Sequence, residues 1–71
     1  MFKEYAVQIQ EKLPTGGYFW AFSGYHKLPE QKYAFKKDAE DAMRRLKMLF
    51  PNDTFRLVER EVHNWKETSR V

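Results

Sequence analysis

The side chains in this sequence that could act as nucleophiles, bases or metal ligands are few and scattered. His26 and His63 are its two histidines, and the segment expected to form a helix separates them. A metal site or a catalytic dyad needs His, Asp or Glu at close spacing, so each histidine is interpreted as a surface residue. The serines and threonines have no local base partner, which a hydroxyl nucleophile requires. The sequence therefore predicts a non-enzymatic protein, with no catalytic and no metal-binding residue.

The clustered carboxylates and the paired glycines are explained by secondary structure rather than by catalysis or phosphate binding. Asp38, Glu40 and Asp41 lie where a helix is expected to begin, and the positive end of the helix dipole favours acidic residues there. Gly16 and Gly17 precede an aromatic strand rather than a helix, so they predict a turn and not a phosphate-binding loop. The chain has no cysteine, which excludes thiolate chemistry and favours an intracellular location. We expect no cofactor.

The sequence offers more residues suited to binding a partner than to catalysis, because aromatic residues are concentrated in one part of the chain. Seven of the twelve aromatic residues lie between Tyr18 and Phe35. Exposed rings beside Lys and Arg can stack on unpaired bases. Rings and arginines are equally typical of protein interfaces. The competing interpretation is that most of these rings form the core of a domain too small to leave them unused.

The positive charge has a definite location. The chain carries a net charge of +3, and residues 25–50 hold seven basic and four acidic residues, so the whole excess lies there. Such an excess on one loop and one helix predicts a modest basic patch. The aromatic and basic candidates for partner binding are Tyr18, Trp20, Tyr25, Lys27, Lys36, Lys37, Arg44 and Arg45.

A single small domain must position these side chains, since 71 residues are too few for two domains. Period-two alternation predicts a strand over 3–12, and a second, aromatic strand follows over 18–23. Apolar residues at three-and-four spacing predict a helix that begins near Lys37 or Asp38 and stops at Pro51. A third strand is expected over 54–62, and residues 24–32 are interpreted as a surface loop.

The element order predicts an α+β fold of two layers, ββαβ, with one amphipathic helix packed on one face of a small antiparallel sheet. We expect this domain to span residues 1–62. Residues 63–71 are expected to form a polar C-terminal tail that frays unless Trp65 packs. The alternation over 18–23 does not indicate which aromatic face is buried. The expected core comprises Val7, Ile9, Trp20 or Phe19, Phe35, Ala42, Met43, Leu46, Leu49, Phe55 and Leu57.

Three segments carry a resemblance to a known class of proteins. They are the aromatic strand 18–22, the helix start 35–42, and residues 49–59, where the helix stops and a strand begins. Over residues 5–62 this layout resembles the small single-domain accessory proteins encoded by tailed bacteriophages. The resemblance implies a protein that binds and modulates a host or phage macromolecule. The shared motifs are structural, so no functional residue is carried over.

Two kinds of partner remain open. The first hypothesis is a host or phage protein, bound by the exposed rings and the basic helix face. The alternative is an RNA-binding accessory protein, for example one that acts on transfer RNA, with basic residues between Lys27 and Lys47 on phosphates and Trp20 or Tyr25 stacked on bases. Such phosphate contacts would make binding fall steeply with salt.

The remaining expectations concern location and assembly. The chain starts without a long apolar run, so we expect no signal peptide, no membrane-spanning segment and no membrane partner. We expect a cytoplasmic protein, in the host cell if it is phage-encoded. An unpaired strand edge in so small a sheet would also permit a homodimer.

Overall fold

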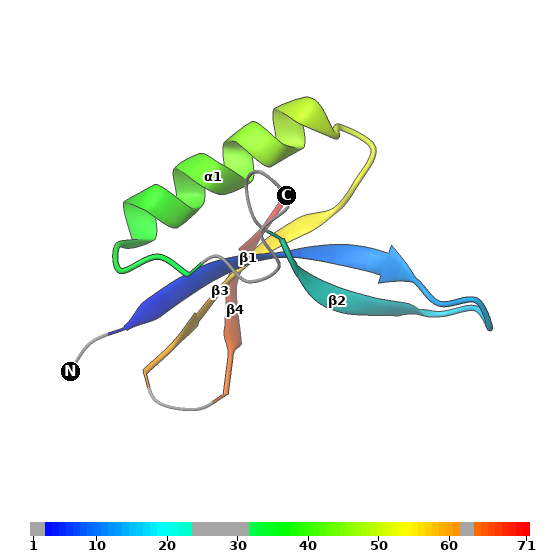
Figure 1. Cartoon of the computed structure of the whole chain (residues 1–71), viewed down its shortest axis with the longest axis horizontal. Helices are drawn as coiled ribbons and strands as arrows, with labels where there is room; N and C mark the ends of the chain where they lie inside the picture. The colour runs from blue at the N-terminus through cyan, green and yellow to red at the C-terminus, as the bar shows by residue number, and fades with distance from the viewer. Residues whose placement is uncertain (1–2, 24–31, 62–63) are drawn as a thin grey trace.

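A computed structural model describes residues 3–23, 32–61 and 64–71 (Figure 1). Its elements in chain order are β1 (Glu4–Lys12), β2 (Tyr18–Ser23), α1 (Lys36–Leu49), β3 (Phe55–Arg60) and β4 (Lys66–Arg70). The strands form one antiparallel sheet in the order β2-β1-β3-β4, and α1 packs on one of its faces. The expected α+β fold, with one amphipathic helix on one face of a small antiparallel sheet, is confirmed.

The first two strands form a hairpin whose turn the glycines permit. The Leu13 N–H donates to the Gly17 carbonyl at 3.0 Å, and the Gly16 N–H donates to the Leu13 carbonyl at 3.1 Å. Gly16 and Gly17 have φ angles of 89° and 86°. Glycine adopts such angles without the clash that a Cβ atom would cause. The hairpin tip projects past the helix (Figure 1).

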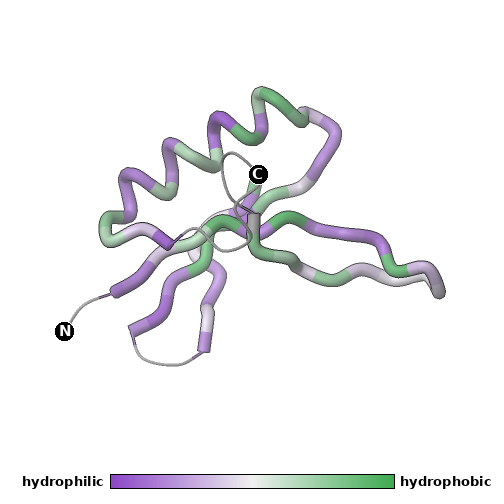
Figure 2. The backbone as a smooth tube through the Cα atoms, viewed as in Figure 1, coloured by the Kyte–Doolittle hydropathy of each residue, from purple (hydrophilic) through white to green (hydrophobic). Residues whose placement is uncertain are grey.

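The core lies between α1 and the two central strands. Figure 2 shows hydrophobic and hydrophilic residues alternating along α1, as an amphipathic helix requires. Phe55 and Leu57 of β3 are fully buried beneath the helix. The buried cluster consists of Val7, Ala39, Ala42, Met43, Leu46, Phe55 and Leu57.

Part of the expected core is wrong. Phe35 is 69% exposed, because it is the extended N-cap residue that precedes the first turn of α1. Leu49 is 60% exposed, because it lies at the end of α1, after Leu46, the last helical residue that is buried. Phe19 is 44% exposed, and Trp20 is partly buried on the sheet face opposite the helix, so neither belongs to the cluster under α1.

A fourth strand, β4, lies within the segment expected to be a polar tail. It pairs antiparallel with β3, and just beyond it Val71 and Phe55 exchange two backbone hydrogen bonds of 2.8 Å. The rings of Trp65 and Phe22 pack with their centroids 5.4 Å apart, which anchors the start of the strand. The fold is therefore ββαββ rather than ββαβ. An edge strand can be polar because backbone hydrogen bonds, not apolar side chains, supply its pairing.

Candidate interaction surface

The sheet face opposite α1 collects side chains from all four strands. Val7 packs under the helix, so its neighbours Ala6 and Gln8 face the other way. The strand register places Phe22 and Arg56 beside Gln8 on that side. We call this surface the helix-free face. Its residues are Gln8, Trp20, Phe22, Arg56, Arg60, Trp65, Glu67 and Arg70.

A β-bulge allows β4 to contribute two charged residues to this face. Glu67 and Arg70 are three positions apart, and a regular strand would point them in opposite directions. The register between β3 and β4 shifts by one residue at Leu57/Val58. Glu67 consequently pairs with Val58 and Arg70 with Arg56, and both side chains lie on the helix-free face.

Trp20 lies against two guanidinium groups. The Cζ atom of Arg56 is 4.4 Å from the centroid of the Trp20 ring, and that of Arg70 is 5.0 Å from it. An exposed cation–π contact of this kind contributes about 0.5–1 kcal/mol. The indole of β2 therefore holds arginines from β3 and β4 in place, although β1 separates those strands from it.

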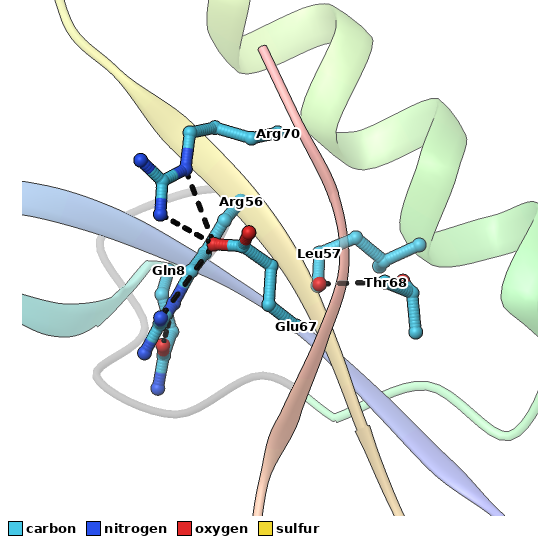
Figure 3. A network of polar contacts seen from close by, with 6 residues as sticks. All are labelled: Gln8, Arg56, Leu57, Glu67, Thr68 and Arg70. Carbon is cyan, nitrogen blue, oxygen red and sulfur yellow. Dashed lines mark hydrogen bonds and ion pairs between the residues drawn. The ribbon is translucent and has the colours of Figure 1, made fainter.

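Glu67 forms ion pairs with both Arg56 and Arg70 (Figure 3). Arg70 donates from Nε and Nη2 to Oε1 of Glu67 at 3.1 and 2.8 Å, and Nη1 of Arg56 lies 3.6 Å from that oxygen. The hydrogen bonds from Arg70 lower the pKa of the Glu67 carboxyl. Nε of Arg56 donates to Oε1 of Gln8 at 2.6 Å. Gln8 is 5% exposed, so this bond satisfies a buried amide oxygen.

A second aromatic and arginine cluster lies beside the first. The Cζ atom of Arg60 is 4.4 Å from the centroid of the Trp65 ring, and the Trp65 and Phe22 rings meet edge to face at 63°. Nη2 of Arg60 is 3.6 Å from Oε2 of Glu4. Both tryptophans of the chain and three of its arginines therefore lie on one surface.

The structure divides the predicted partner-binding residues between two surfaces. Tyr18 and Trp20 alternate with Phe19 along β2 and lie on the side away from the helix. The predicted residues on α1 are exposed on the opposite layer, and they are Lys36, Lys37, Arg44 and Arg45. Tyr25 and Lys27 lie outside the described residues. The rings of β2 and the basic helix residues therefore do not form one continuous site.

Of the eight residues of the helix-free face, only Trp20 was among the predicted partner-binding residues. Arg56 and Arg60 lie on the side of β3 opposite Phe55 and Leu57, so their shared side was visible in the alternation. Trp65 and Arg70 gave no such signal, because β4 was not expected and the bulge changes which of its residues share a face.

Two further kinds of feature are absent from the residues that the structure describes. Within 3–23, 32–61 and 64–71, no group of three or more His, Asp or Glu is placed to hold a metal ion. In the same ranges, no helix has the length and apolar character needed to cross a membrane. Comparison of the chain with protein-family models, with curated proteins and with solved structures finds no match.

Proposed function

We propose that this chain is a non-enzymatic accessory protein of the phage type that binds and modulates a host or phage protein through its helix-free face. One observation carries the proposal: Trp20, Trp65 and three arginines from β3 and β4 meet on a single surface. Tryptophan and arginine are the residues most enriched at the energetic centres of protein interfaces. We place its action in the cytoplasm of the host cell.

The geometry favours such a role because the charged side chains are already held in place. Guanidinium groups that are stacked on indole rings and paired with carboxylates lose little freedom when a partner binds. Arg56 and Arg70 are fixed in this way by Trp20 and Glu67, and Arg60 is fixed by Trp65. A planar, pre-positioned guanidinium suits a partner that presents carboxylate or backbone carbonyl groups.

An RNA partner is the second candidate, and the same pairing of rings with arginines favours it. The charge of the face argues for the protein instead. The three arginines and the two carboxylates paired with them, Glu4 and Glu67, carry one net positive charge together, so phosphates would compete with carboxylates already in contact with these arginines. The exposed basic residues of α1 lie on the other side of the sheet, so they cannot contact a phosphate bound at the helix-free face.

Two arginines supply a closely matched test. Arg70 on the helix-free face and Arg44 on α1 have exposed side chains, and each forms an ion pair with an acidic residue three positions earlier in the chain. Tagged wild-type protein, Arg70→Glu and Arg44→Glu would be used to capture partners from bacterial lysate, with and without nuclease. Circular dichroism would first establish that each variant is folded.

A protein partner and an RNA partner would give different results in this capture experiment. Capture of a stoichiometric protein that survives nuclease, is lost with Arg70→Glu and is kept with Arg44→Glu supports the proposal. Equal capture by both variants would exclude the helix-free face as the contact surface. Recovery of RNA that disappears as salt rises, and that both variants weaken, would favour the RNA-binding alternative.

A further inference from the structure

The two edges of the sheet differ in how well they are protected from other strands. The edges are β2 and β4. Natural sheets protect exposed edges with charged residues, with bulges and with short strands. The edge strand β4 has five residues, three of them charged, and a register shift against β3. The edge strand β2 reads Tyr-Phe-Trp-Ala-Phe-Ser and contains no charged residue and no proline.

The direction of the backbone groups in β2 follows from the hairpin. The N–H of Leu13 points to the β2 side of β1, whereas the N–H of Gln10 donates to Thr54 on the β3 side at 2.9 Å. Because this direction alternates along a strand, the odd-numbered residues of β1 bond to β2. Their partners are Phe19, Ala21 and Ser23. The N–H and C=O groups of Tyr18, Trp20 and Phe22 therefore point away from the sheet, and no described strand pairs with them.

We propose that this outer edge of β2 pairs antiparallel with β2 of a second copy, which joins the two sheets into one. A two-fold axis at Trp20 would set Trp20 opposite Trp20 of the second copy and Tyr18 opposite its Phe22. The N–H and C=O groups of Tyr18, Trp20 and Phe22 would then all be hydrogen-bonded, since two residues paired in this way exchange two hydrogen bonds. On the helix side, Phe19 would lie opposite Ala21 of the second copy.

The side chains of β2 are compatible with this pairing, and those of β4 are not. Cross-strand aromatic pairs are favourable, and like charges placed directly opposite are unfavourable. The β2 pairing contains only uncharged residues. In β4, by contrast, three of the five residues are charged, and the bulge interrupts the regular row of outward backbone groups that such pairing needs. The contrast selects β2 as the interface. The pairing would also make the helix-free faces of the two copies continuous.

The test places one lysine on each edge. Phe19→Lys introduces the charge on the helix side of β2, opposite Glu11, which preserves pairing with β1. Ser69→Lys is the matched control. Ser69 is exposed, and it lies opposite Leu57, so it is on the helix side of the other edge strand, β4. Sedimentation equilibrium would measure the dimer dissociation constant from about 1 μM to about 1 mM protein, which spans weak and moderate association.

We expect wild-type protein to dimerise within this range. Phe19→Lys should raise the dissociation constant at least about tenfold, because it removes the contact with Ala21 of the second copy and places a charge on the pairing edge, and Ser69→Lys should change it less than about twofold. Amide exchange gives a second measurement that needs no variant. Exchange of the Tyr18, Trp20 and Phe22 amides should slow as protein concentration rises, whereas the Phe19 and Ala21 amides should be protected at every concentration.

Three results would overturn the proposal. One is a wild-type protein that stays monomeric at about 1 mM. Another is a dimer whose outward β2 amides exchange at a rate independent of concentration, which would place the interface elsewhere. The third is protection of these amides only when another protein is added, which would make the edge a site for a foreign strand. Because no step uses the arginines of the helix-free face, failure here leaves the proposed function untouched.

Discussion

Replacing Arg56 with alanine tests whether the helix-free face is built into the fold. The substitution removes the hydrogen bond to Gln8 and leaves a buried amide oxygen unpaired, which costs about 1–3 kcal/mol. Loss of the contact with Trp20 adds about 0.5–1 kcal/mol. Loss of the ion pair with Glu67 adds about 0–1 kcal/mol, because that pair is partly exposed. Since neighbouring contacts are not additive, we expect a total loss of about 2–4 kcal/mol.

Urea unfolding followed by circular dichroism would measure this loss. In a domain of this size it corresponds to a fall of at least about 10 °C in Tm. Arg45→Ala is the matched control, because Arg45 is exposed on α1, and it should change the free energy of unfolding by less than about 0.5 kcal/mol. Arg56→Lys keeps the charge but not the planar donor, so its loss should fall between the two.

A double-mutant cycle would separate the Gln8 contact from the others. In a Gln8→Ala background, Arg56→Ala should lose about 1–2 kcal/mol less than in the wild type, because the amide oxygen is already absent. Equal losses for Arg56→Ala and Arg45→Ala would refute the reasoning. The arginines of the face would then be loose surface groups, and the argument from pre-positioning would fail with them.

Four further perturbations test other parts of the structure. Phe55→Ala should cost about 3–5 kcal/mol in urea unfolding, because the ring is fully buried, while Met48→Ala at an 82% exposed site should be nearly neutral; similar losses would place the core elsewhere. Gly17→Ala should cost about 1–2 kcal/mol, since its φ of 86° strains any residue with a Cβ, and a neutral result would contradict the hairpin turn. The pKa of Glu67 is lowered by its hydrogen bonds from Arg70, so its contribution to stability is present above the ordinary glutamate pKa and is lost as the pH falls through the lowered value. Glu67→Gln should therefore flatten the acid limb of a stability–pH curve, and an unchanged limb would argue against that ion pair. Trp65→Ala should speed amide exchange throughout β4 without unfolding the rest of the sheet, and unchanged exchange would mean that the ring does not anchor the strand.

The sequence predicted the elements whose signals are local. The spacing of Ala39, Ala42, Met43 and Leu46 predicts one face of a helix, and those residues are buried. The paired glycines predict the turn, because few other residues adopt their φ angles. The alternation in β1 predicts a half-buried strand, and Val7 lies in the core.

The parts that were missed depend on partners distant in the chain. The ring of Trp20 is covered by Arg56 and Arg70, which come from strands that the aromatic pattern of β2 does not reveal. The strand β4 has no apolar pattern, because its stability comes from backbone pairing at an edge. Glu67 and Arg70 share a face only because of a bulge in the pairing with β3. The main charged cluster of the candidate site therefore had no local signature.

Side-chain footprinting tests the central claim most directly. Hydroxyl radicals would oxidise the protein alone and in the complex recovered from bacterial lysate, and mass spectrometry would quantify the modified residues. Trp20 and Trp65 lie on the helix-free face, and Met48 is an internal control on α1. The account predicts that oxidation of both tryptophans falls in the complex while that of Met48 is unchanged. Protection of Met48 with unchanged oxidation of the tryptophans would contradict it.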